Sequence, residues 1–220
     1  MKFKAVVFDL DGTLLDTLDD LADSMNHVLA KYSYPVHEVD AYKYFVGNGL
    51  RELVRKTFPE GFRDDENVDH GLSELREEYS SRWSSKTKPY EGIAGLLNAL
   101  ADKGLKMAVL SNKADDFTKL MVRKLLPDWN FNLVFGERNG VPRKPDPAGA
   151  LEIASSLGIQ PQECLYLGDT GVDMRTAVSA GMYPIGVLWG FRKAEELVEN
   201  GAKVLIANPA TVLDLYIPFF

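Results

Sequence analysis

The chain contains few of the residues on which thiol and imidazole chemistry depend. It has one cysteine and three histidines in 220 residues, so no internal disulfide can form. Cys164 lies in the apolar segment ECLYLG with no histidine in any nearby motif, which favours a buried hydrophobic role over a nucleophilic one. For His27, His37 and His70, surface or packing roles are favoured over catalysis.

The chain also lacks an excess of positive charge and any long apolar run. Lys and Arg total 25 against 32 Asp and Glu, a formal charge of -7, which leaves no basic surface for nucleic acid or an anionic membrane. No apolar segment approaches the roughly 20 residues that span a bilayer, and the first apolar run is too short for a signal peptide. We expect a cytoplasmic protein in which any small anionic substrate meets a local positive site.

Short apolar runs alternate with stretches of helical period. After Ala5-Val6-Val7, four further runs are rich in β-branched or large aliphatic residues: 105–111, 131–136, 164–169 and 183–189. Between them, apolar residues recur at helical spacing, as at Ile93, Leu96, Leu97 and Leu100. Such alternation is typical of a parallel sheet covered on both faces. The sequence predicts a Rossmann-like α/β fold with a further helix near 193–200 and a short last strand.

Residues 16–87 interrupt this alternation. A strand, its crossover helix and the next strand need roughly 30 residues, and the helix at 92–103 already supplies the crossover. The extra segment carries helical stripes of its own, which predicts an inserted α-helical cap on a core of residues 1–15 and 88–220. Asp16 or Thr17 is expected to cap its first helix, with Asp20 near the positive end of that helix.

Polar side chains stand where the predicted strands end. Asp9 and Asp11 follow the first strand, Ser111-Asn112-Lys113 the second, and Asp169 and Asp173 the fourth, while the loop after the third contains Lys144. Ligands of open parallel sheets bind at the carboxyl ends of the strands, so these residues are expected to share one site.

These residue types suit phosphoryl transfer. A carboxylate such as Asp9 can attack phosphorus if the repulsion between the two anions is neutralised, and Mg²⁺ held by Asp9 and Asp169, with Asp173 as a further acceptor, would do so. Lys144 and Ser111 can hold the phosphoryl oxygens. Asp11 is then available to protonate the leaving oxygen and to deprotonate the hydrolytic water.

The motifs DLDGTLLDT, LSNK, RKPDP and GDTGVD, in this order, resemble the four signatures of the haloacid dehalogenase superfamily of phosphohydrolases. The resemblance implies that Asp9 is the nucleophile and Asp11 the general acid and base. It implies Mg²⁺ as cofactor, with Asp11 contributing its backbone carbonyl. The roles that it implies are phosphate binding for Ser111, Asn112 and Lys144, and metal binding for Asp9, Asp11, Asp169 and Asp173.

The predicted cap contains the segment Val46-Gly47-Asn48-Gly49, which resembles the cap loop of phosphoglycolate phosphatases. Two glycines that open a helix let backbone N–H groups approach an anion such as a substrate carboxylate. A plain turn between helices explains the segment equally well. Arg51 either adds charge to such a site or remains in solvent.

The resemblance leaves several activities open. A phosphomonoesterase acting on a short organic phosphate such as 2-phosphoglycolate is expected. The alternatives are a pyrophosphatase, a sugar-phosphate or nucleotide phosphatase, a mutase like β-phosphoglucomutase, and a catalytically silent phosphate-binding module. Asp11 argues against a dehalogenase, and Thr13 and the late position of Arg51 argue against a mutase. The sequence permits a monomer or a homodimer, and its apolar end, residues 215–220, is expected to pack on the core.

Overall fold

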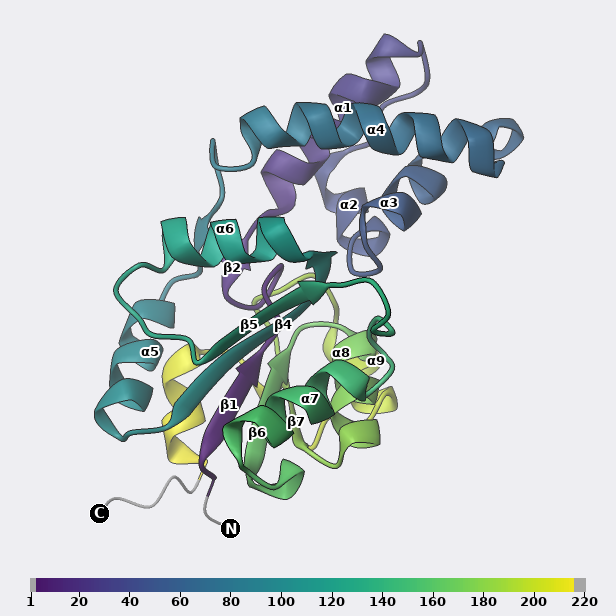
Figure 1. Ribbon diagram of the computed structural model, residues 1–220. Coiled ribbons are helices and arrows are strands. Elements are labelled where there is room, and N and C mark those ends of the chain that lie inside the picture. Colours follow the sequence, from purple (N-terminus) through teal and green to yellow (C-terminus); the bar gives the residue numbers. More distant parts are fainter. Residues whose placement is uncertain (1–2, 216–220) are drawn as a thin grey trace. The chain divides into compact units, whose positions relative to one another are not determined.

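The computed structural model describes residues 3–215, so the apolar end at 216–220 lies outside the described residues. The chain divides into two compact units, Met1–Leu15 with Pro89–Phe220, and Asp16–Lys88. The first is called the core unit below and the second the inserted unit (Figure 1). No helix among the described residues is both long enough and apolar enough to cross a membrane.

The core unit is built on a parallel sheet. Its strands within the described residues are β1 (Ala5–Phe8), β4 (Lys106–Ala114), β5 (Leu133–Glu137), β6 (Cys164–Gly168), β7 (Tyr183–Val187) and β8 (Val204–Ile206). They lie in the order β5-β4-β1-β6-β7-β8 and every pairing is parallel. β1 is central, and all four of its residues are fully buried.

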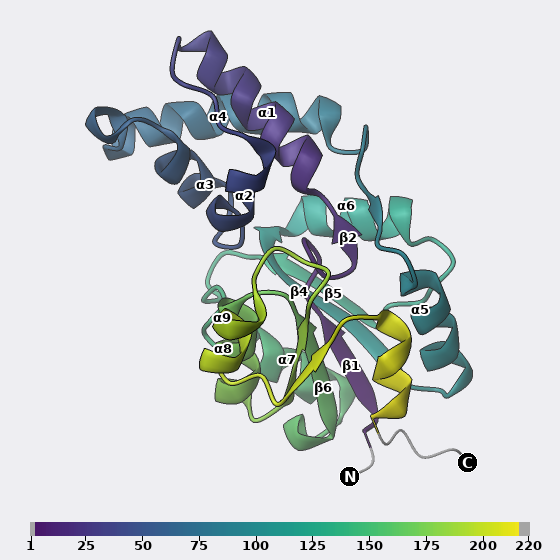
Figure 2. The ribbon, with the colours of Figure 1, turned by 180° about the vertical axis from the view of Figure 1, so that it is seen from behind.

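Helices cover both faces of this sheet, as Figures 1 and 2 show. The core-unit helices are α5 (Ile93–Asp102), α6 (Asp115–Leu125), α7 (Ala148–Leu157), α8 (Gly171–Ala180) and α9 (Ala194–Glu199), with 3-10 turns η2 (Pro161–Glu163) and η3 (Pro209–Asp214). The stripe at Ile93, Leu96, Leu97 and Leu100 forms the buried side of α5. On the opposite face, α7 and α8 pack on Ala5 and Val7 of β1. The expected Rossmann-like α/β fold is confirmed.

The inserted unit is helical. Its helices are α1 (Leu18–Lys31), α2 (Val39–Phe45), α3 (Leu50–Thr57) and α4 (Asp65–Arg82), with the 3-10 turn η1 (Glu60–Phe62). Leu21, Met25 and Leu29 form the buried side of α1. α3 and α4 approach closely at Gly71, where an added Cβ would lie 2.5 Å from the Phe58 ring. The unit therefore has a hydrophobic core of its own.

The chain enters and leaves the inserted unit through β2 (Leu15–Asp16) and β3 (Lys88–Pro89), which pair in a two-stranded sheet. The expected side-chain cap of α1 is wrong. Thr17 occupies the N-cap position, but its hydroxyl makes no capping bond and is buried without a hydrogen-bond partner among the described residues. Asp20 turns instead to the returning chain, where it accepts bonds from the backbone N–H groups of Lys86 and Thr87 and from the Thr87 hydroxyl.

Candidate active site

The end of β1 turns sharply so that Asp9 and its neighbours meet the end of β6. Asp9 is 7% exposed and follows the last residue of the strand. Gly12 has a φ of +88°, a left-handed conformation that suits glycine. A Cβ on Gly12 would lie 2.3 Å from Oδ2 of Asp169. Only glycine therefore lets this turn come so close to the Asp169 carboxylate.

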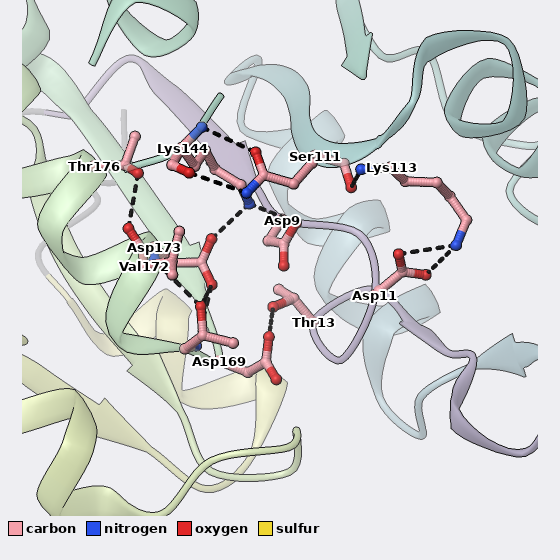
Figure 3. A network of polar contacts seen from close by, with 12 residues as sticks. Asp9, Asp11, Thr13, Ser111, Lys113, Lys144, Asp169, Val172, Asp173 and Thr176 are labelled. Carbon is pink, nitrogen blue, oxygen red and sulfur yellow. Dashed lines mark hydrogen bonds and ion pairs between the residues drawn. The ribbon is translucent and has the colours of Figure 1, made fainter. Parts of the chain in front are cut away.

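One buried ammonium joins two of the predicted carboxylates. Lys144 Nζ donates to Asp9 Oδ1 at 2.8 Å and to Asp173 Oδ1 at 2.7 Å, as Figure 3 shows. Lysine and both acids are almost fully buried. In so dry an environment, charged hydrogen bonds are strong and the loss of one partner is costly.

Asp169 is held from the opposite side of the cluster. Its Oδ2 accepts from the backbone N–H of Phe191 at 2.8 Å, and its Oδ1 accepts from the Thr13 hydroxyl at 3.3 Å. Gly190 is also required here, because a Cβ at that position would lie 2.3 Å from Cβ of Asp169. The Asp169 carboxylate is thus enclosed by backbone on two sides.

Asp173 lies in the first turn of α8, where a capping box fixes it. Its Oδ2 accepts from the backbone N–H of Thr170 at 3.1 Å and from the Thr170 hydroxyl at 2.6 Å. Its Oδ1 faces Lys144. A Cβ on Gly168 would lie 2.2 Å from Cβ of Asp173, so the strand end leaves no space for a side chain beside it.

Asp9, Asp169 and Asp173 form the one group of potential metal ligands found among the described residues, with one oxygen of each lying within 4.8 Å of the others. Three ionised carboxylates facing one ammonium leave a formal charge of about -2, which a divalent cation would neutralise. Hard carboxylate oxygens are the ligands that Mg²⁺ and similar cations take. The residues present therefore fit a hard divalent cation.

The protein alone does not favour full ionisation of this cluster. Burial and the nearby Asp173 raise the pKa of Asp9 to about 7, although Lys144 opposes the rise. Burial, followed by the charge of Asp173, likewise raises the pKa of Asp169 well above its usual range. Carboxylates so close together resist simultaneous ionisation, and a bound cation would lower both pKa values.

Ser111 and Asn112 extend β4 beyond β1. Val109 of β4 pairs with Phe8, the last residue of β1, and β4 continues to Ala114. The Asn112 amide holds the backbone of Lys144 by accepting from its N–H at 2.9 Å and donating to its carbonyl at 3.1 Å. In the geometry observed, Asn112 therefore places the lysine, and the Ser111 hydroxyl accepts from the backbone N–H of Lys113 at 3.2 Å.

Asp11 does not join the cluster around Lys144. Lys113 Nζ donates to both of its carboxylate oxygens, each at 3.0 Å, and Figure 3 shows this carboxylate directed away from that of Asp9. Lys113 belongs to the LSNK motif but had no predicted role. Its position two residues after Ser111 at a strand end was the signal that could have identified it.

A loop absent from the predicted site completes the enclosure. Phe191 supplies its backbone N–H to Asp169, and the Trp189 indole donates to the carbonyl of Thr13 at 3.0 Å. These residues follow β7, the fifth strand of the predicted set. Reading the end of that strand by the same rule would have pointed to them.

Of the predicted cap residues, Arg51 bonds two carboxylates of the inserted unit, and the glycines shape the backbone before α3. Gly47 and Gly49 have φ values of +120° and +84°, and α3 begins directly after Gly49. The Arg51 guanidinium donates to Asp69 Oδ1 at 2.9 Å and to Asp65 Oδ1 at 3.0 Å. These two carboxylates belong to α4, so in this structure Arg51 links α3 to α4.

The family model of the haloacid dehalogenase-like hydrolases matches residues 6–187 of the chain. The chain belongs to the haloacid dehalogenase-like hydrolases. Curated relatives include the phosphoglycolate phosphatase of Aquifex aeolicus, which is 32% identical over 90% of each chain. The phosphoglycolate phosphatase of Pseudomonas putida is 30% identical over 96% of this chain and 76% of its own length.

Solved structures agree with the family assignment. The crystal structure of a provisionally named phosphoglycolate phosphatase from Lactobacillus delbrueckii subsp. bulgaricus superimposes with a TM-score of 0.91, at 31% identity and over 98% of each chain. For this haloacid dehalogenase-like chain, the expectation of a phosphoric monoester hydrolase is confirmed. Its cation, its intermediate and its substrate are questions for the geometry and for experiment.

Proposed function

We propose that the protein is a Mg²⁺-dependent phosphomonoesterase that forms an aspartyl-phosphate on Asp9 and hydrolyses a short organic phosphate such as 2-phosphoglycolate. One observation carries this proposal. The Asp9 carboxylate lies at the end of the central strand, within hydrogen-bonding distance of the buried Lys144 ammonium and beside two further buried carboxylates. That arrangement gives a nucleophile and the charges needed to bring a phosphate to it.

In the first step an oxygen of Asp9 bonds to phosphorus and the bond from phosphorus to the leaving oxygen breaks. Asp11 gives its proton to that oxygen, so the product leaves as an alcohol. In the second step water attacks the phosphorus of the acyl phosphate, Asp11 takes a proton from the water, and Asp9 is released with inorganic phosphate. Asp11 is thus protonated when the substrate binds and ionised between the two steps, and the ionised form is the one whose two oxygens Lys113 bonds in this structure.

Lys144 supports the first step because it already contacts the nucleophile. Its ammonium bonds Asp9 on one side and Asp173 on the other, and phosphoryl oxygens that approach Asp9 come within reach of the same ammonium. The Ser111 hydroxyl, at the end of β4, is proposed to donate to those oxygens. Asn112 contributes by fixing the backbone from which Lys144 extends.

Mg²⁺, when bound, supplies the positive charge that reduces repulsion between Asp9 and the phosphate. Asp9, Asp169 and Asp173 are proposed to hold it, with the backbone carbonyl of Asp11. Thr13 and the N–H of Phe191 keep the Asp169 carboxylate in place, and Thr170 does the same for Asp173. Neutral hydrogen-bond donors therefore hold Asp169 and one oxygen of Asp173, while the Lys144 ammonium bonds Asp9 and the other oxygen of Asp173.

Substrate choice is proposed to lie in the inserted unit, acting as a cap. The relatives named phosphoglycolate phosphatase support 2-phosphoglycolate. Within the inserted unit, the backbone at Gly47, Asn48 and Gly49 is the candidate for contact with a second anionic group on the substrate.

The test is phosphate release by the purified protein from 2-phosphoglycolate, p-nitrophenyl phosphate, pyrophosphate, sugar phosphates and nucleotides. The proposal predicts Mg²⁺-dependent release that excess chelator stops, with the highest kcat/KM on 2-phosphoglycolate. Unchanged activity in chelator would contradict the metal requirement. An isomerised sugar phosphate without phosphate release would identify a mutase, and no reaction with any substrate would favour a silent phosphate-binding module.

A further inference from the structure

Lys113 is a buried lysine that the proposed reaction has not used. Its side chain is 3% exposed, and its ammonium bonds both oxygens of Asp11 at equal distances of 3.0 Å. An ammonium removed from water needs a charged partner to offset its lost hydration. The geometry explains how Lys113 tolerates burial and shows that the two side chains depend on each other.

The position of Lys113 follows from the unequal lengths of two strands. β1 ends at Phe8, opposite Val109, whereas β4 continues to Ala114 with a shift in its pairing to β5. Lys113 therefore stands beside the segment that follows β1, where Asp11 lies. The Asn112 side chain bonds the backbone of Lys144, so two neighbouring residues of one strand act on different parts of the site: Asn112 on Lys144 and Lys113 on Asp11.

The two ammonium groups separate two carboxylates that are only two residues apart in the chain. Lys144 holds Asp9 toward Asp173, while Lys113 holds Asp11 away from that cluster, as Figure 3 shows. Without Lys113, the Asp11 carboxylate would lose both of these charged hydrogen bonds and could move from this position. A carboxylate so displaced would stand wrongly for proton transfer to a leaving oxygen.

We propose that Lys113 is a positioning residue that acts through Asp11, by bonding both of its carboxylate oxygens and so fixing where the proton-transfer group stands relative to Asp9. This inference rests on the proposed function. Loss of Lys113 should therefore affect some substrates more than others. Substrates whose leaving oxygen needs a proton depend on Asp11, whereas a nitrophenolate leaves without one.

The test compares kcat/KM for 2-phosphoglycolate and p-nitrophenyl phosphate in wild type, Lys113→Met, Asp11→Asn and the double variant. kcat/KM covers the steps up to transfer of the phosphoryl group to Asp9 and leaves out hydrolysis of the intermediate. Lys113→Met should lower the value for 2-phosphoglycolate about 10²-fold and that for p-nitrophenyl phosphate less than about tenfold. The double variant should fall within about threefold of Asp11→Asn, because the lysine acts through that residue.

Lys106→Met is the matched control. Lys106 begins the same strand, at its other end, and its ammonium donates to the carbonyl of Leu157. This variant should leave the ratio of the two kcat/KM values unchanged. Lys113→Arg should recover most of the 2-phosphoglycolate activity, since a guanidinium can also donate to both carboxylate oxygens.

Thermal unfolding identifies any variant that does not fold. If Lys113→Met fails to fold, Asp11→Asn is compared with the double variant instead. The double variant has neither the ammonium nor the carboxylate, so no unpaired charge is buried there, and its kcat/KM relative to Asp11→Asn tests whether Lys113 acts through Asp11. Equal losses on both substrates, or a double variant far below Asp11→Asn, would overturn the positioning role. A wild-type protein that releases phosphate from neither substrate would instead refute the proposed function and the inference with it.

Discussion

Charge is distributed differently in the two units of the molecule. At the end of the core sheet, Asp9, Asp169 and Asp173 are buried around a single ammonium, that of Lys144. In the inserted unit, Arg51 and its neighbours bond carboxylates that are mostly exposed. Exposed pairs of this kind contribute little to stability, whereas a cluster of buried like charges is costly and is typical of functional sites. From this comparison we expect the reaction to take place in the core unit rather than in the inserted unit.

The largest effect on activity is expected from substitution of Asp9, the proposed nucleophile. Asp9→Asn should lower kcat/KM for p-nitrophenyl phosphate by at least about 10⁴-fold, because an amide oxygen is a poor nucleophile at phosphorus. Asp20→Asn is the matched control, since Asp20 is a fully buried aspartate whose carboxylate bonds, within residues 3–215, Lys86 and Thr87 of its own unit. Phosphate release should fall by less than about threefold in the control. Similar losses in both variants would abolish the distinction between the two units.

Asp20→Asn should instead destabilise the protein. The Asp20 carboxylate accepts hydrogen bonds from two backbone N–H groups and a hydroxyl. In Asp20→Asn, the NH₂ of the amide would face one of these donors, and the hydrogen bond at that place would be lost. We expect a loss of about 3 kcal/mol in the free energy of unfolding, measured with urea. A change below about 1 kcal/mol would mean that the returning chain does not depend on this carboxylate.

The unbalanced charge at the sheet end should appear as a pH dependence of the metal-free protein. Folding raises the pKa of Asp9 from 3.8 to about 7. Between these two pH values, Asp9 is therefore protonated in the folded state and ionised in the unfolded state. This group's contribution to stability is complete below pH 3.8 and is lost as pH rises through about 7.

Between pH 5 and 8, metal-free wild type should therefore lose about 2 kcal/mol more stability than Asp9→Asn, as measured with urea in excess chelator. Mg²⁺ should restore wild type at pH 8 and should restore the variant less. If the free energy of unfolding depended on pH in the same way for both proteins, the pKa of Asp9 would not be raised in the folded state.

The smallest effect is expected at Arg51. Its guanidinium bonds exposed carboxylates of α4, so Arg51→Ala should change the melting temperature by less than about 2 °C and KM for 2-phosphoglycolate by less than about threefold. A tenfold rise in KM at unchanged kcat would mean that Arg51 binds the substrate and that charge in the inserted unit is functional after all.

The fold was predictable because its signals are local. Runs such as Ala5-Val6-Val7 are buried on both faces of a parallel sheet, and stripes such as that of α5 mark one buried side of a helix. Strand ends and charged residues then indicated Asp9, Lys144, Asp169 and Asp173, which the structure brings into one cluster.

The remaining features depend on distances that local patterns do not encode. The pairing of Lys113 with Asp11 joins residues 102 positions apart, and residue type alone did not reveal which lysine serves which acid. Phe191 acts through its backbone N–H, which every residue except proline has. Thr17 could cap α1 by type, but its hydroxyl makes no capping bond, and Asp20 bonds Thr87, a residue 67 positions away.

The most direct test of the account is the stereochemical course at phosphorus with a chirally labelled substrate. Attack by Asp9 followed by attack of water involves two displacements, each of which inverts phosphorus. The account predicts overall retention of configuration in wild type. Inversion would show a single displacement by water and would contradict the assignment of Asp9 as the nucleophile.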